Sequence, residues 1–228
     1  MDIKIIASGS SGNAYLIGDG KTHLLLDAGI SFKRIQIGCG FKTSSIDACL
    51  VTHRHGDHAA AIPKILQRGI TVYSNADVAG LYPGVQSVDA LREFRIGTFR
   101  VLPFEAEHDV PCYGYQATSV ETGEKLVYIT DSAYVKYTFS GLTHIMIEAN
   151  YAQEIIIDNA KHERIPLYLA ERVIQTHMSI ETLLDLLQAN DMSKVRQIYL
   201  LHLSDGNSDA EAFKRQVQQE TGAEVYIA

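Results

Sequence analysis

The feature that constrains this chain most is a short segment in which metal-ligand side chains follow an apolar strand, Leu50-Val51-Thr52-His53-Arg54-His55-Gly56-Asp57-His58. Imidazole and carboxylate are ligands that zinc, manganese and iron accept in proteins. Alternation along an extended segment puts His53 and His55 on the same side, so both can reach one ion. Asp57 and His58 follow where the chain turns into a helix, and Gly56 gives the backbone freedom for that turn. The segment predicts a metal-binding loop rather than a solvated histidine-rich loop.

Polar residues also stand just after apolar runs elsewhere in the chain, at Asp27, His108, Asp131 and His202. One short loop cannot saturate two ions, so a dinuclear site needs further groups from distant segments. Strand ends are where loops present functional groups on a rigid scaffold. Taken singly, each of these residues is more typical of a structural or surface position than of a metal site. Together with the loop, they form a candidate ligand set.

The hydrophobic pattern predicts a mixed α/β chain. Apolar runs between turn signals predict strands at 3–7, 13–17, 23–26, 48–52, 97–103, 112–118, 125–129, 143–147, 197–201 and 224–227. Helical spacing predicts helices at 59–68, 164–175, 179–189 and 209–220. Ser179 is expected to cap the third of these. The order favours two sheets packed face to face with helices outside, and leaves a doubly wound α/β fold open.

Length and composition narrow the class of protein. The 228 residues predict one domain, 1–228, and 46% apolar residues suffice for a core. The chain has no apolar run of about 18 residues and no leader-like N-terminus, so we expect a cytoplasmic protein without a membrane partner. Cys39, Cys49 and Cys112 are isolated, which predicts buried free thiols. A net charge of −7 counts against nucleic-acid binding by charge alone, but not against a nuclease whose metals meet the phosphate.

Two further stretches carry possible chemistry. The opening turn contains Ser8, Gly9, Ser10, Ser11, Gly12 and Asn13. Its backbone N–H groups can form a nest that receives a phosphate, although an ordinary hairpin turn has the same composition. His177 stands just before a predicted helix. From there it can protonate a leaving oxygen, or it can be a surface or capping histidine.

The candidate residues occur in the order of the five motifs of the metallo-β-lactamase superfamily, which the chain resembles from Asp27 to His202. The resemblance implies a four-layer αββα sandwich with the site along an edge where both sheets end. It also implies two divalent ions, zinc, manganese or iron, with a hydroxide bridging them. The implied ligands are His53, His55 and His108 for one ion, Asp57, His58 and His202 for the other, and Asp131 for both. Asp27 is implied to orient the metal loop, residues 53–58.

Within the superfamily, the 8–13 turn together with His177-Met178-Ser179 and His202-Leu203-Ser204 resembles the YycJ/WalJ group. That resemblance implies a manganese-dependent 5′ exonuclease on DNA, with Asp57, Asp131 and His177 as catalytic residues. The chain departs from the group at Tyr151-Ala152, where relatives commonly read His-Asp. A small-molecule phosphodiesterase and a glyoxalase II-like thioester or lactone hydrolase stay open. So do the metal, DNA against RNA, cleavage polarity and the oligomeric state.

Overall fold

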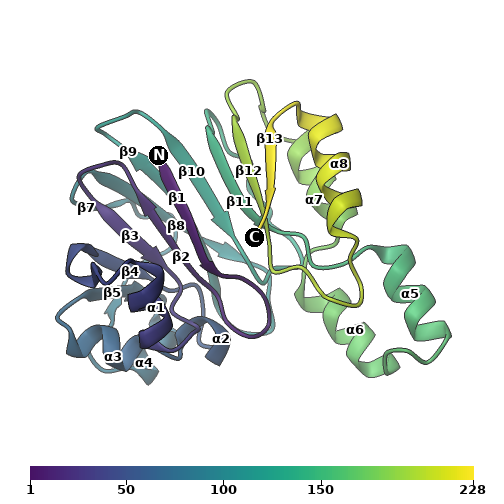
Figure 1. Ribbon diagram of the computed structural model, residues 1–228, viewed down its shortest axis with the longest axis horizontal. Coiled ribbons are helices and arrows are strands. Elements are labelled where there is room, and N and C mark those ends of the chain that lie inside the picture. Colours follow the sequence, from purple (N-terminus) through teal and green to yellow (C-terminus); the bar gives the residue numbers. More distant parts are fainter. The chain divides into compact units, whose positions relative to one another are not determined.

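The structure, a computed structural model, describes residues 1–228 and divides them into two units (Figure 1). The first unit comprises Met1–Glu105 and Val110–Glu124, and the second comprises Ala106–Asp109 and Lys125–Ala228. The single-domain expectation stays a prediction. None of the helices combines the length and the apolar character needed to cross a membrane.

The first unit holds a sheet in which strands follow one another in sequence order: β1 (Asp2–Ala7), β2 (Ala14–Gly18), β3 (His23–Leu26), β4 (Ala48–Leu50), β5 (Thr71–Ser74) and β6 (Gln86–Ser87). The pairs β1–β2 and β2–β3 are antiparallel, whereas β3 to β6 pair in parallel. Parallel neighbours bring the ends of β3 and β4 to the same edge of the sheet, and the metal loop leaves from that edge.

Short helices cover this sheet (Figure 1): α1 (Phe32–Gly38), α2 (Gly56–Ala59), α3 (Ile62–Gln67) and α4 (Ala76–Leu81), with a 3₁₀ turn, η1, at Thr43–Ser45. Ile35 of α1, Ile65 of α3 and Val78 of α4 are buried with Leu25 and Val72 of the strands in one apolar core. Burying these side chains stabilises the unit by about 1.5–3 kcal/mol for each large residue. The core therefore fixes the sheet edge that carries the metal loop.

The predicted helix at 59–68 is divided in the structure. Helix α2 ends at Ala59, and α3 begins at Ile62 with Pro63 in its first turn. The N–H of Ala61 donates to the carbonyl of Ala28 at 2.8 Å, so that donor leaves the helical pattern. Proline has no N–H and fits only the first turn of a helix. The prediction was wrong here because a tertiary hydrogen bond interrupts a continuous helical pattern.

Strands β7 (Phe94–Ile96), β8 (Phe99–Ala106) and β9 (Cys112–Ser119) complete the strands of this part of the chain. β7 and β8 form an antiparallel hairpin around Gly97, whose φ is 52°. The carboxylate of Asp19 accepts hydrogen bonds from Thr98 Oγ1 and Ser119 Oγ, both at 2.6 Å. These contacts tie the β2–β3 turn to the ends of the β7–β8 hairpin and of β9.

The second unit contains four parallel strands in the order β10 (Lys125–Ile129), β11 (His144–Glu148), β12 (Gln197–Leu201) and β13 (Glu224–Ile227). Its helices are α5 (Gln153–Lys161), α6 (Leu167–Thr176), α7 (Ile180–Gln188) and α8 (Ala210–Thr221), with α7 and α8 side by side (Figure 1). Ser179 caps α7 as predicted, since its Oγ accepts from the N–H of Thr182 at 3.1 Å. Helix α6 begins three residues later than predicted because Pro166 is its N-cap.

Every predicted strand is present: β3, β10, β12 and β13 have the predicted bounds, and the others have ends shifted by up to three residues. The pattern missed the short strands β5 to β7 and the helices α1, α4 and α5. In α5 the isoleucines at 155–157 are consecutive, so they give no helical period. The three cysteines are free and buried, as predicted.

Candidate metal centre

One buried carboxylate organises the metal loop in the first unit. Asp27 Oδ2 lies 2.7 Å from Nδ1 of His58, and Asp27 Oδ1 accepts the N–H of Thr52 at 2.8 Å. The Thr52 hydroxyl lies 3.1 Å from both carboxylate oxygens and 3.0 Å from Nδ1 of His53. Asp27, Thr52, His53 and His58 are all fully buried. A single aspartate thus reaches two histidines, one directly and one through a hydroxyl.

This arrangement determines which ring nitrogens can bind a cation. The carboxylate of Asp27 accepts a hydrogen bond from Nδ1–H of His58, and the Thr52 hydroxyl, while donating to Asp27, accepts one from Nδ1–H of His53. Each ring then keeps its lone pair on Nε2. A metal-binding histidine needs this tautomer, and a carboxylate behind it raises its basicity. Thr52, which the sequence interpretation did not single out, therefore belongs to the site.

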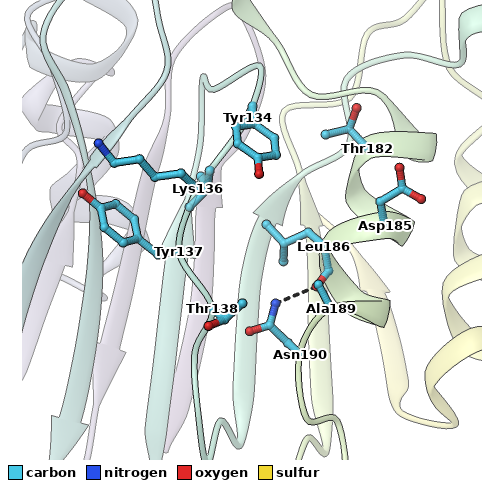
Figure 2. A pocket seen from close by; sticks show the side chains of 10 residues that line it. Tyr134, Lys136, Tyr137, Thr138, Thr182, Asp185, Leu186, Ala189 and Asn190 are labelled. Carbon is cyan, nitrogen blue, oxygen red and sulfur yellow. Dashed lines mark hydrogen bonds between the residues drawn. The ribbon is translucent and has the colours of Figure 1, made fainter.

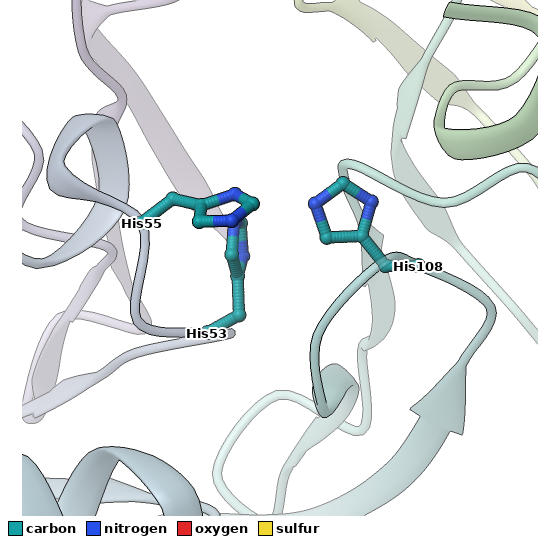
Figure 3. Close-up of side chains that lie close together, drawn as sticks. All are labelled: His53, His55 and His108. Carbon is teal, nitrogen blue, oxygen red and sulfur yellow. The ribbon is translucent and has the colours of Figure 1, made fainter. Parts of the chain in front are cut away.

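His55 and Asp57 stand at the start of α2. His55 is the N-cap of that helix, and its ring meets the ring of His53 edge to face with centroids 4.7 Å apart (Figure 3). Asp57 lies in the first turn, with Oδ2 3.6 Å from Nε2 of His58. The loop thus brings His53, His55, Asp57 and His58 together within one unit.

The glycine that this loop requires is Gly29 rather than Gly56. Gly56 has no positive φ, and a Cβ there would meet nothing within 4 Å. A Cβ on Gly29 would lie 1.5 Å from the carbonyl oxygen of Asp57. The expectation for Gly56 was wrong because the chain enters α2 with ordinary helical angles, and it is the close approach of two backbones that excludes a side chain.

The 8–13 turn packs against the metal loop and uses several of its own donors. The N–H groups of Gly9, Gly12 and Asn13 donate to Asn13 Oδ1, Gly9 O and Asp57 O at 3.0, 3.0 and 2.8 Å. Asn13 is fully buried, and its Nδ2 lies 3.0 Å from Nε2 of His58. These three N–H groups are thus not available to a phosphate, which corrects the expectation of a nest across the whole turn. Ser10 and Ser11 are exposed, and Ser8 Oγ accepts from Tyr15 at 2.9 Å.

In the second unit, the structure gathers Asp131, Glu148, His177 and His202, whose nearest ligand atoms all lie within 4.8 Å of one another. The rings of His177 and His202 stack with centroids 5.3 Å apart. Nε2 of His202 lies 3.8 Å from Asp131 Oδ1. Three of these four residues were predicted from the sequence, and Glu148 was not assigned a role.

Glu148 is fully buried and organises this group much as Asp27 organises the first. Its Oε1 lies 2.6 Å from Nδ1 of His177 and 3.4 Å from Nδ1 of His202. Its Oε2 accepts the N–H groups of Ser132 and Met178 at 3.0 and 3.3 Å. Glu148 is the last residue of β11, just as Asp27 follows β3. Glu148 therefore fits the same pattern, a polar residue at the end of an apolar strand, that predicted the other site residues.

His108 also lies in the second unit (labelled in Figure 3), just beyond the end of β8. Its Nδ1 donates to the carbonyl of Thr176 at 2.9 Å, and its Nε2 lies 3.1 Å from Asp109 Oδ1. Its ring centroid is 5.9 Å from that of His177. The last turn of α6 thus fixes the ring of His108 and carries His177 as its C-cap.

The pKa values of His108 and His177 are shifted in opposite directions. Burial lowers the pKa of His108 below its usual value, which keeps it neutral as a metal ligand must be. Burial also disfavours the charged form of His177, but the charge and hydrogen bond of Glu148 outweigh this effect and raise its pKa. Burial disfavours the charged form of Glu148 as well, yet its pKa is lowered by His177. The contact with the buried Glu148 therefore favours the protonated form of His177.

The departure at Tyr151-Ala152 has a structural role. Tyr151 is buried with Ile156 and Ala170 in a small apolar core between α5 and α6. Its carbonyl accepts the N–H of Ile180 at 2.8 Å, and the N–H of Ala152 donates to Asn207 O at 2.9 Å. These residues connect the helices rather than offer metal ligands.

Three of the predicted site residues share an unusual backbone conformation. Asp27, Asp131 and His202 have φ values of 55°, 47° and 51°. Each follows the end of a parallel strand, β3, β10 or β12. A positive φ is uncommon outside glycine, although aspartate, asparagine and histidine tolerate it better than other residues. Such conformations cluster at functional sites.

The donor chemistry of both groups fits divalent metal ions. The candidate ligands are imidazoles and carboxylates without thiolates, which suits zinc, manganese and iron. In the first unit Asp27 and Thr52 hold His53 and His58 in the tautomer that binds metal, and in the second the Thr176 carbonyl does this for His108.

Comparisons with known proteins agree with this chemistry. Residues 22–203 match the family described as "Beta-lactamase superfamily domain". The chain is 27% identical to Exodeoxyribonuclease WalJ of Streptococcus pneumoniae, over 91% of this chain and 83% of that protein. It is 26% identical to Exodeoxyribonuclease YycJ of Bacillus anthracis, over 96% and 88%. The metallo-β-lactamase fold protein YhfI of Bacillus subtilis superposes with a TM-score of 0.76 at 19% identity, covering 99% and 95%. The predicted fold class is confirmed.

Proposed function

The chain belongs to the β-lactamase superfamily, and from that premise we propose that this hydrolase cleaves phosphodiesters in DNA, working from the 5′ end with divalent metal ions. The similarity to WalJ and YycJ supports the substrate class, because it extends over more than four-fifths of those exodeoxyribonucleases. The observation that carries the proposal is the buried Glu148–His177 ion pair beside Asp131 and His202. It supplies an acid beside candidate metal ligands.

We propose that His53, His55 and His108 hold one ion, that Asp57, His58 and His202 hold a second, and that Asp131 serves both. Such ions, when bound, lower the pKa of water and offset charge on a phosphate. Asp27, with Thr52, orients His53 and His58. The exposed Ser10 and Ser11 offer hydroxyl and N–H groups to the phosphate.

The contact between His177 and Glu148 determines which proton of His177 can be donated. Glu148 raises the pKa of His177 in spite of its burial, which favours the protonated form of the ring. Nδ1 is committed to Glu148, so the proton on Nε2 is the one that can move to a departing oxygen. Phosphodiester cleavage needs this proton, because an alkoxide is a poor leaving group. Thiolates leave without it, so the ion pair favours a phosphodiesterase over a thioesterase.

Digestion of 5′- and 3′-labelled DNA and RNA tests the proposal, with manganese, zinc or a chelator present. We expect release of nucleotides from the 5′ end of DNA with metal and none with the chelator. Bis-p-nitrophenyl phosphate, a lactone and a glutathione thioester should be run in parallel. Faster turnover of the thioester or lactone than of any phosphodiester would reject the proposal.

Two substitutions test the residue roles. Asp57→Ala should abolish digestion and remove bound metal, whereas Asp89→Ala, at an exposed aspartate of the same unit, should do neither. His177→Ala should slow turnover with the metal content intact, whereas His162→Ala, at an exposed histidine of the same unit, should leave turnover unchanged. Loss of metal in His177→Ala would make His177 a ligand instead of an acid.

A further inference from the structure

A cavity of about 380 Å³ lies in the second unit between the segment 134–138 and helix α7 (Figure 2). Tyr134 and Thr138 line it from the segment, and Thr182, Leu186 and Asn190 line it from the helix. Its volume lies within the range of small-ligand sites. None of its lining residues belongs to the candidate metal centre.

The two chain segments that line the cavity are both preceded by a residue whose N–H donates to Glu148. Oε2 of Glu148 accepts the N–H of Ser132, two residues before Tyr134, and the N–H of Met178, four residues before Thr182. One oxygen of the candidate site thus fixes the two chain segments that diverge to form the cavity. Asp131 and His177 directly precede Ser132 and Met178 in the chain, so the two segments that lead to the cavity begin at the candidate site.

Hydrogen bonds fix the backbone of the segment 134–138 at Tyr134. The carbonyl of Tyr134 accepts from Ser132 Oγ at 2.8 Å and from the N–H of Glu107 at 3.2 Å. Tyr134 is three residues after Asp131, so their Cα atoms are at most about 11 Å apart. The Tyr134 side chain is nevertheless 58% exposed, so its ring can be contacted by a ligand.

The chemistry of the lining suits a nucleobase. Tyr134 offers an aromatic face at the mouth, and the buried Leu186 extends from α7 toward the segment (Figure 2). Asp185 and Thr182 offer hydrogen-bonding groups along α7, and the carboxylate disfavours a phosphate inside the cavity. Lys136 extends away from α7, with its Nζ 5.4 Å from the ring centroid of Tyr137.

We infer that this cavity receives the base of the nucleotide next to the cleaved bond, with Tyr134 stacking on it. The inference rests on the proposed function and assigns the cavity to a nucleoside whose phosphate lies at Asp131 and His177. Stacking on an aromatic ring is tolerant of sequence because every base has a π-face. Such a contact would add to what the metals contribute, since a net charge of −7 counts against binding DNA by charge alone.

A fluorescence titration tests the cavity directly. The chain has no tryptophan, so Tyr134→Trp introduces a single reporter that keeps an aromatic face. Titration with dAMP should quench it saturably, whereas 2-deoxyribose 5-phosphate, which has no base, should not. Tyr168→Trp is the matched control, because Tyr168 is 74% exposed on α6 and does not line the cavity. Absent quenching, or equal quenching in both variants, would overturn the inference.

Steady-state kinetics with two substrates provide a second test of the cavity. Tyr134→Ala should lower kcat/KM for a 5′-labelled oligonucleotide about tenfold relative to kcat/KM for bis-p-nitrophenyl phosphate, mainly through KM. Tyr134→Trp should restore the wild-type ratio, and Tyr168→Ala should keep it. An unchanged ratio in Tyr134→Ala would also overturn the inference.

The two proposals fail in different ways. If the wild type digests no nucleic acid, the proposed function is wrong, and the dAMP titration still decides what the cavity binds. If the wild type digests DNA while Tyr134→Ala keeps the wild-type ratio and dAMP quenches neither tryptophan, only the cavity assignment is wrong.

Discussion

Nδ1 of His177 lies 2.6 Å from Oε1 of Glu148, inside a unit where that carboxylate has no exposed surface. The same carboxylate accepts two backbone N–H groups and an N–H of Asn150 at 3.2 Å. These contacts keep Glu148 ionised in spite of its burial, because hydrogen bonds to the charged form and a nearby cation offset the cost of desolvation. The charge on His177 therefore depends on Glu148.

Glu148→Gln should slow the reaction. The amide keeps the shape but removes the negative charge that raises the pKa of His177, so the protonated form of that ring is less favoured. We expect kcat on labelled DNA to fall about 100-fold. The free energy of unfolding should fall by about 1–3 kcal/mol, since an NH₂ group would face at least one of the present donors. Glu154→Gln, at an exposed glutamate of α5, serves as the control. Wild-type kcat would show that Glu148 only supports the fold.

Asp27→Asn should weaken metal binding, although Asp27 is not itself a proposed metal ligand. The asparagine NH₂ would meet Nδ1 of His58 or the Thr52 hydroxyl, and the tautomers of His53 and His58 would no longer be held. We expect the Kd for manganese or zinc to rise about 10- to 100-fold, measured by calorimetric titration. Asp89→Asn should keep the wild-type Kd. An unchanged Kd in Asp27→Asn would mean that the histidines orient themselves.

Gly29→Ala should disrupt the metal loop although Gly29 carries no side chain. An added methyl would meet the carbonyl of Asp57 at 1.5 Å, so the backbone carrying Asp57 and His58 must move. We expect loss of bound metal in plasma emission spectroscopy and a lower melting temperature. Gly56→Ala is the matched control inside the loop itself, where the methyl has open space. Equal metal loss in both variants would contradict this account.

Asp19 should make the protein less stable in acid. Partial burial by itself raises the pKa of Asp19, but hydrogen bonds from Ser119, Thr98 and the backbone outweigh it and lower the pKa to about 2. Because the pKa in the folded protein lies below the 3.8 of an unperturbed aspartate, the stabilisation is present above about pH 4 and is lost as the pH falls toward 2. Urea unfolding from pH 5 to pH 2 measures it.

The comparison for Asp19 uses the variant Asp19→Asn. The difference in unfolding free energy between wild type and this variant should shrink as the pH falls through that window. Thr98→Val combined with Ser119→Ala should reduce the same difference, because it removes the hydroxyl donors. A difference that stays constant with pH would show that the hydrogen bonds do not depend on the charge of Asp19.

The sequence predicted the strands and the residues at their ends well, because apolar runs and the polar groups after them are local signals. Asp27, Asp131 and His202 were found in this way. Glu148 obeys the same rule, but no role was predicted for it. Its role depends on Ser132, Met178 and His177, contacts that no local pattern encodes.

The failures concern close approach between distant segments. Gly29 and Asp57 are far apart in sequence, and only the folded chain shows that their backbones leave no space for a methyl group. The division of the helix at 59–68 has a similar origin, in the hydrogen bond from Ala61 to Ala28. The turn at 8–13 was interpreted by composition, but Asn13 is buried there against the metal loop.

The left-handed backbone at Asp27, Asp131 and His202 limits what an engineer can install at the ends of β3, β10 and β12. Aspartate, asparagine, histidine and glycine adopt that geometry at tolerable strain, whereas valine, isoleucine and threonine do not. Substitutions that keep a metal-binding side chain at these positions are thus restricted to a few residues with oxygen or nitrogen donors. Retuning this protein toward a softer metal such as copper would have to begin at other positions, in loops whose backbone is not committed in this way.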